Sequence, residues 1–214
     1  MQKADAIKRE GASAISPSAL WRLPPGDELT MMQATGHIQT FKAFFQAHLR
    51  PWIASLVLLP VCFQFASVGE LDFLRRDIPF LYGLLDNLTL VTHEAGHFFF
   101  HFFGTFMMFA GGTLLQIILP SFLVWHFFRN DYTLGTQLSL LWLGQSFNGI
   151  SIYAADARKR ILPLLGDNLD GHDWYNMLTR LGMLEWDLAL GFIFQALCWI
   201  AFLALLLAPR FIQD

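Results

Sequence analysis

The sequence predicts an all-α, polytopic membrane protein, a helical bundle with about five transmembrane helices, from three observations. First, 55% of the 214 residues are hydrophobic and only 14% are charged, whereas a soluble domain carries about 25% charged residues. Second, five apolar segments long enough to cross a bilayer follow residue 50. Third, short polar turns or a glycine separate most of these segments. The net charge of −3 is too small to indicate a nucleic-acid partner.

Residues 1–50 are predicted to form a cytoplasmic N-terminal tail, and residues 51–208 a transmembrane domain. The tail holds six of the fourteen lysines and arginines and no long apolar run. Because the first apolar segment begins only after residue 50, we expect an uncleaved anchor rather than a signal peptide. Within the tail, residues 40–48 carry three phenylalanines and are a candidate for a helix lying along the membrane surface.

Five spans are predicted, with bounds at 52–68, 78–103, 105–128, 132–155 and 187–208. The first is close to the minimum length for crossing a bilayer, and the charged segment 70–77 separates it from the second. Gly104 ends the second span, and the fourth span is the most polar. The 156–186 segment is predicted to be a soluble loop.

The distribution of lysine and arginine predicts the orientation. Five spans place three segments on one side of the membrane: the tail, the turn at Gly104 and the 156–186 loop. These segments hold ten lysines and arginines, and the segments on the other side hold four. The positive-inside rule then makes the N-terminus and the 156–186 loop cytoplasmic.

The second span contains an H-E-x-x-H motif, His93-Glu94-Ala95-Gly96-His97. Residues four apart lie on one face of a helix, so His93 and His97 can bind one metal ion, for which zinc is the candidate. Glu94 lies beside them, where it can act as a base toward a water molecule on the metal. Apolar neighbours surround the motif, and burying these groups is costly unless they are paired or metal-bound. A polar contact between helices is the plainer alternative.

A catalytic zinc ion takes three protein ligands and keeps an open position for water. His93 lies fifteen residues into its span, about 22 Å from the start at 1.5 Å per residue, and thus on the cytoplasmic side where the fourth span ends. The third ligand is therefore sought among Asp156, His172, Asp173 and, less favoured, His101. Asp156 is preferred over His172 because a helix end positions a ligand better than a loop does.

These residues resemble the site-2 protease family of intramembrane zinc metalloproteases. Three features carry the resemblance: the H-E-x-x-H helix, a glycine-containing third span, and Asn148 eight residues before Asp156. In that family, an Asn precedes by eight residues the Asp that is the third zinc ligand. The prolines and the Leu-Asp-Gly ending of the family motif are absent at this point of the sequence. The chain also resembles a small group of uncharacterised bacterial membrane proteins with an H-E-A-G-H helix, which suggests the bacterial inner (cell) membrane.

The resemblance implies a zinc-dependent, membrane-embedded peptidase that cleaves a transmembrane or membrane-associated protein segment. Glu94 would be the general base, and Asn148 would hydrogen-bond the substrate or the oxyanion. Two alternatives remain open: a metal-binding membrane protein that is not a protease, and an iron oxidase or hydroxylase built on histidine clusters. The iron enzymes need more histidines than this chain offers near the motif, and a pure binding site does not need Glu94.

Overall fold

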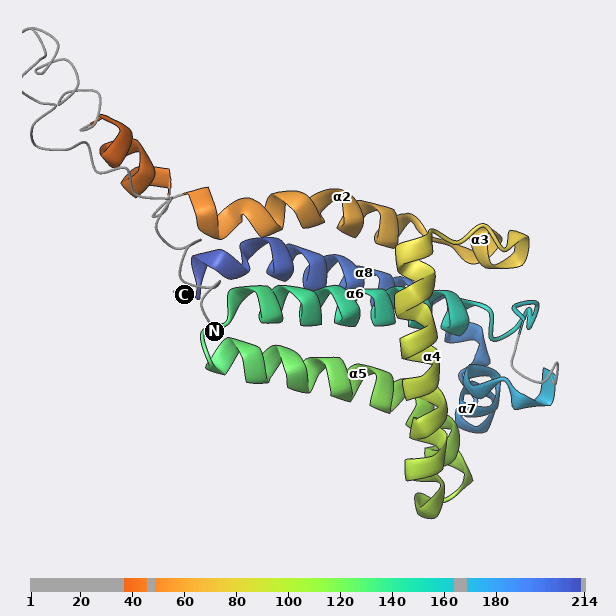
Figure 1. Cartoon of the computed structure of the whole chain (residues 1–214). Coiled ribbons are helices and arrows are strands. Elements are labelled where there is room, and N and C mark those ends of the chain that lie inside the picture. Colours follow the sequence, from red (N-terminus) through yellow and green to blue (C-terminus); the bar gives the residue numbers. More distant parts are fainter. Residues whose placement is uncertain (1–36, 46–48, 164–168, 213–214) are drawn as a thin grey trace, which may run out of the picture. The chain divides into compact units, whose positions relative to one another are not determined.

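The computed structural model describes residues 37–45, 49–163 and 169–212 (Figure 1). The chain divides into two units, Met1–Arg50 and Pro51–Asp214, which are described separately. In the first unit, residues 37–45 are helical and exposed. Residues 46–48 of the predicted surface segment lie outside the described residues, and the contact of 40–48 with a membrane stays a prediction.

The second unit is all-α, as predicted, and no strand occurs in the described residues. Its α-helices are α2 (Ile53–Ser67), α3 (Glu70–Arg75), α4 (Phe80–Phe100), α5 (Thr105–Arg129), α6 (Thr133–Ala155), α7 (Asp173–Leu181) and α8 (Asp187–Leu207). Short 3-10 turns join or extend them at Arg50–Trp52, His101–Phe103, Leu169–Gly171, Leu184–Trp186 and Ala208–Arg210. Each of the five predicted apolar segments is a helix with bounds close to those expected.

Two short helices were not expected, because both lie in polar stretches. The α3 helix begins at Gly69, whose N–H donates to the Asp72 carboxylate at 2.8 Å, and it ends at Arg76 with a left-handed φ of 56°. The α7 helix replaces part of the predicted 156–186 loop. At its start His172 Nδ1 accepts the N–H of Tyr175 at 3.2 Å, so the imidazole caps the helix.

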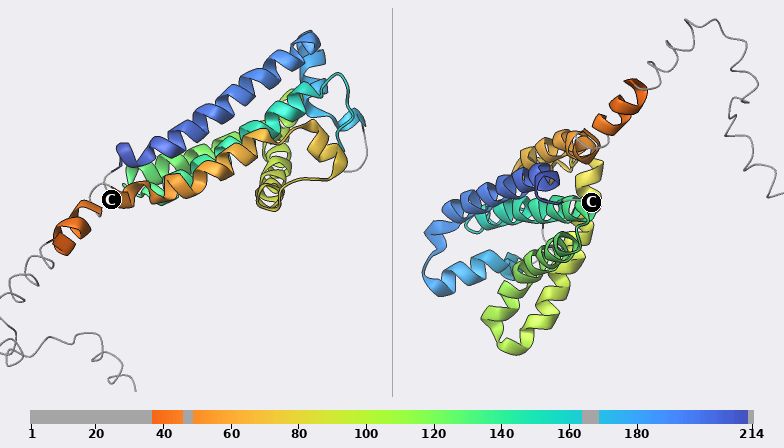
Figure 2. Two further views of the ribbon diagram at one scale, coloured as in Figure 1. Left: turned by 90° about the horizontal axis from the view of Figure 1, so that it is seen from above. Right: turned by 90° about the vertical axis from the view of Figure 1, so that its left-hand side faces the viewer.

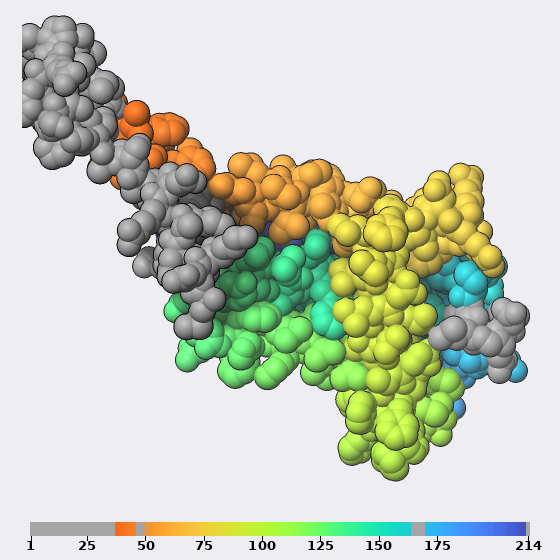
Figure 3. Space-filling view, viewed as in Figure 1, coloured from red at the N-terminus to blue at the C-terminus, as the bar shows by residue number. Residues whose placement is uncertain are grey.

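The α4 helix crosses the other long helices (Figures 1 and 2). The α2, α5, α6 and α8 helices run roughly alongside one another, and α4 passes over them near the end of the bundle at which α3 and α7 also lie. In the space-filling view α4 forms a ridge across the surface of α5 and α6 (Figure 3). The α4 helix therefore does not share the direction that five side-by-side spans would require.

Two helical segments are long and apolar enough to cross a membrane, Thr105–Arg129 and Leu184–Arg210. The α2 helix is apolar but shorter. The α6 helix falls outside this set because it carries polar side chains, which it buries inside the bundle. Gln137, for example, donates to Ser55 Oγ at 2.8 Å and to the Leu205 carbonyl at 3.2 Å. Such interhelical hydrogen bonds satisfy polar groups that would otherwise be costly within a bundle.

Candidate metal centre

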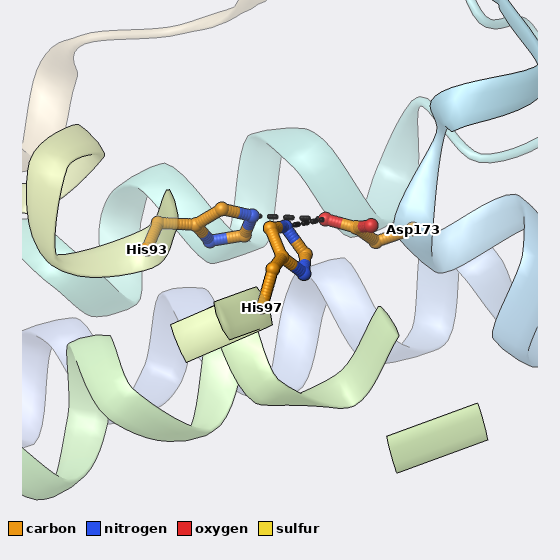
Figure 4. Close-up of side chains that lie close together, drawn as sticks. All are labelled: His93, His97 and Asp173. Atoms are coloured by element: carbon orange, nitrogen blue, oxygen red, sulfur yellow. Dashed lines mark hydrogen bonds and ion pairs between the residues drawn. The ribbon is translucent and has the colours of Figure 1, made fainter. Parts of the chain in front are cut away.

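Three side chains from α4 and α7 converge on one point (Figure 4). His93 Nε2 lies 2.8 Å from Asp173 Oδ2, and His97 Nε2 lies 3.3 Å from the same oxygen. One ligand atom from each residue lies within 4.8 Å of the other two. His93 and His97 share this face because they are four residues apart on α4, as the motif predicts. Asp173, the first residue of α7, reaches them from a helix 80 residues later in the chain.

The Nδ1 atoms of both imidazoles lie within hydrogen-bond distance of carbonyl oxygens. His93 Nδ1 lies 2.6 Å from Gln116 Oε1, and the Gln116 amide nitrogen in turn donates to the Ser146 carbonyl at 3.4 Å. His97 Nδ1 lies 2.7 Å from the Met108 carbonyl oxygen. A carbonyl oxygen can only accept, so each Nδ1 must carry the hydrogen. Metal-binding histidines are characteristically held in this way, with the distal N–H donated to a carbonyl or carboxylate.

This arrangement leaves the lone pair of each neutral Nε2 pointing at the Asp173 carboxylate. Three acceptors then converge, which is unfavourable unless a metal ion lies among them or at least one imidazole is protonated and pairs with the carboxylate. Two imidazolium ions with one carboxylate would place a net positive charge in a site where His93 is 9% exposed and Asp173 is 4% exposed. Burying an unbalanced charge is costly, and either a single imidazolium paired with Asp173 or a bound metal ion would avoid it. The three side chains are therefore a candidate metal site.

Asp173 is suited to ligate a cation because it is ionised. Burial alone would raise the pKa of its carboxyl, but hydrogen bonds and positive charge from His93 and His97, which protonated imidazoles supply in the metal-free site, hold that pKa below its ordinary value. A bound cation would act in the same direction. The residue was one of four candidates for the third ligand, although Asp156 and His172 were preferred over it. The local signal that marks it is its place at the start of an amphipathic helix, where a rigid element fixes the side chain.

The two preferred candidates form a separate pair. His172 Nε2 lies 3.4 Å from Asp156 Oδ2, a long ion-pair contact, and both side chains are fully buried. The Asp156 carboxylate also accepts the backbone N–H groups of Ile161 and Leu162, each at 3.1 Å. Because His172 Nδ1 accepts the N–H of Tyr175, Nε2 carries the hydrogen and faces the carboxylate as a donor. The contact is too poorly aligned to be a hydrogen bond, so His172 Nε2 is left without a hydrogen-bond partner among the described residues. The pair lies apart from the group around Asp173.

Glycines allow α4 and α5 to approach closely at the site. The backbone of Gly111 lies directly against Gly96, so a Cβ at either position would collide with the opposite helix. At Gly112 a Cβ would lie 2.5 Å from Nε2 and Cε1 of His93. Small residues commonly permit such contacts between apolar helices. The sequence analysis noted only that the third predicted span contains glycine, and no local pattern indicates a role for Gln116.

Glu94 is exposed and lies at the edge of the site. At about 100° per residue, it is displaced by about 60° around α4 from His97. It therefore belongs to the same side of the helix without pointing into the group of three. This is the position expected for a base that acts on a bound water molecule rather than for a ligand.

Asn148 and His101 do not join the group. Asn148 accepts from the Tyr82 hydroxyl at 2.7 Å and donates to Gln195 Oε1 at 3.0 Å and to the Val68 carbonyl at 3.3 Å. Both of its N–H donors are thus engaged in joining helices. His101 is exposed, and its Nδ1 lies 2.6 Å from the Phe98 carbonyl of the preceding turn.

No family model, curated protein or solved structure matches the chain.

Gly112→Ala is expected to disrupt the metal site without changing a ligand. The added methyl group would occupy the position of the His93 ring, so either the ring or α5 must move. We expect zinc affinity to fall by at least the ~10–100-fold typical of losing a partner that orients a ligand. Competition with a fluorescent chelator measures this affinity. Gly83→Ala on α4 is the control, because its Cβ would meet only Ile78 at 3.8 Å; equal zinc affinity in the two variants would contradict the prediction.

Proposed function

We propose that the protein is a zinc-dependent, membrane-embedded peptidase that cleaves a transmembrane or membrane-associated protein segment. The observation that carries the proposal is the convergence of ligand-type atoms from His93, His97 and Asp173, with the exposed Glu94 next to His93 on α4. Placement in the membrane is supported by the two helical segments of spanning length and apolarity. The bacterial cell membrane is proposed on the resemblance in sequence alone.

The donor set fits zinc. Two imidazole nitrogens and one carboxylate oxygen form the type of three-ligand set found in catalytic zinc sites, which leaves a fourth position open. Bound zinc would supply a polarised substrate carbonyl and a water molecule of lowered pKa. His93, His97 and Asp173 would hold the ion, and Gln116 and the Met108 carbonyl would orient the imidazoles.

Glu94 would hold and move the proton. Its exposed carboxylate would take a proton from the attacking water and pass it to the amine that leaves when the peptide bond breaks. The proposal assigns the third-ligand role to Asp173 rather than to Asp156 or His172, because those two side chains contact each other. It assigns no catalytic role to Asn148, whose N–H donors are engaged elsewhere.

A second candidate shares the same ligands. Two histidines and one carboxylate also form the facial triad of non-haem iron oxygenases. This reading removes the objection that the chain has too few histidines, because the triad needs only His93, His97 and Asp173. Glu94 separates the candidates: peptide hydrolysis requires a base at that position, and the iron chemistry does not.

Hydrolysis by the purified protein in detergent tests the proposal. Fluorescein-labelled casein serves as a general substrate, with a synthetic transmembrane peptide as a second probe. We expect cleavage that 1,10-phenanthroline abolishes and added zinc restores. Cleavage that persists without metal, or metal-loaded protein that cleaves neither probe while consuming oxygen in the presence of ferrous iron, would contradict the proposal.

A further inference from the structure

We propose that α4 lies in the plane of the membrane, along one boundary of the bilayer, with one apolar stripe in lipid and the metal-binding face against the bundle. The proposal rests on the membrane placement above and differs from the expectation that this segment is a span. The apolar stripe of α4 would contact the acyl chains next to the lipid headgroups rather than a protein partner.

The first support is the distribution of side chains around α4. An exposed apolar stripe runs along it at helical spacing, with exposed fractions of 84% at Phe80, 60% at Leu84, 69% at Val91 and 64% at Phe98, and it continues to Phe102. Buried polar and small residues occupy the opposite face, namely Tyr82, Thr89, His93 and Gly96. The exposed polar residues Asn87 and Glu94 lie along one edge of the stripe. A helix at a membrane boundary can keep such groups in water while its apolar stripe contacts lipid.

The second support is the direction of α4 relative to the helices that can cross a membrane. Both segments that can cross a membrane, Thr105–Arg129 and Leu184–Arg210, belong to the set of helices that α4 crosses (Figures 1 and 2). If these helices run across the bilayer, a helix that crosses them runs along it. The α5 and α8 helices also expose large apolar side chains, such as Phe122 and Phe192, as helices in lipid do, and the same lipid would cover the stripe on α4.

The third support is the charge at the end of the bundle where α4 lies. Lys159 Nζ pairs with Glu70 Oε2 at 2.6 Å, and Arg158 Nε pairs with Asp187 Oδ2 at 2.7 Å. Both cationic side chains are nearly half exposed. Exposed ion pairs are unfavourable within hydrocarbon, so this end of the bundle marks an aqueous boundary.

An in-plane α4 changes the depth of the metal centre. The site would lie near the boundary, where the water consumed in hydrolysis is available, rather than about 22 Å into the bilayer. The scissile bond would then belong to a substrate segment next to the membrane surface.

An in-plane α4 also changes the topology, because α2, α5, α6 and α8 would be four spans. The start of α2 and the end of α8 would share one side of the membrane, opposite the 156–186 segment. The cations would divide eight to six, so the positive-inside rule would no longer choose an orientation.

Spin labels along α4 test the inference. Cys62 and Cys198, both free and buried, are replaced, and single cysteines are introduced at Leu84, Val91 and Phe98 in full-length protein in phosphatidylcholine vesicles. Accessibility to oxygen and to a nickel chelate gives the depth of each label. We expect all three labels at one shallow depth. A spanning α4 would place Val91 about 10 Å deeper than the other two, from seven residues at 1.5 Å each, and that result would overturn the inference.

Labels at Ile200 and Leu207 on α8 are the matched control, since both positions are exposed and seven residues apart. We expect Ile200 near the middle of the bilayer and Leu207 near its edge. If the α8 labels are not in lipid at all, the membrane placement itself fails together with the inference. If the two α8 labels differ in depth as expected, and the α4 labels differ in depth by a similar amount, only the in-plane position of α4 fails.

Discussion

Replacing Asp173 by asparagine is expected to remove zinc from the protein while preserving its fold. Zinc would lose the only anionic ligand of the three described above, so the loss of affinity should exceed the ~10–100-fold that follows removal of an orienting partner. The asparagine amide would instead donate hydrogen bonds toward the lone pairs of His93 and His97. The metal-free variant also loses the stabilising pairing of the Asp173 carboxylate with the imidazoles, so it should unfold cooperatively at a temperature slightly below that of metal-free wild type. Zinc titration and thermal unfolding followed by circular dichroism measure the two quantities.

The matched control is Asp156→Asn. Asp156 is a second buried carboxylate beside a histidine, but it contacts backbone N–H groups and His172. We expect this variant to keep its zinc. Loss of zinc from Asp156→Asn, with zinc retained in Asp173→Asn, would contradict the assignment and restore the ligand set implied by the resemblance to site-2 proteases.

Glu94→Gln is expected to keep zinc and lose hydrolysis. The substitution preserves the size of the side chain but removes the group that accepts the proton, and general acid–base catalysis contributes about 10²–10⁴-fold to rate. We expect kcat on casein to fall within that range with zinc content unchanged. Because Glu94 is exposed and is not one of the three proposed ligands, the effect on stability should be small.

Glu185→Gln provides the control for a general loss of charge, since Glu185 lies in the Leu184–Trp186 turn rather than on α4. Its activity should equal that of wild type. A Glu94→Gln variant that loses zinc would make Glu94 a ligand, and one that keeps full activity would remove it from catalysis.

The sequence predicted the helices well because each is encoded locally. Apolar runs bounded by polar turns or by Gly104 placed all five long helices, and the H-E-x-x-H spacing placed His93 and His97 on one face. The direction of α4 was not predictable in this way. It depends on contact between Gly96 and Gly111, and nothing local shows that two glycines in different helices will meet.

The contacts of Asp156 and Asp173 show a similar limit. Asp156 has the spacing from Asn148 seen in site-2 proteases and stands at a helix end, but the chain turns back after it, with Arg160 at a φ of 50°, and brings two backbone N–H groups to its carboxylate. Asp173 reaches the histidines because His172 caps α7 and thereby fixes the start of that helix. Both outcomes depend on turns whose geometry the sequence does not display.

The zinc content of the protein tests the central claim most directly. Wild-type protein, purified without added metal and then incubated with zinc and desalted, should retain about one zinc ion per chain, as a single three-ligand site would hold. His93→Ala, treated identically, should retain almost none, because two ligands leave a weak site. Wild-type protein that retains no zinc, or a His93→Ala variant that retains as much as wild type, would contradict the account.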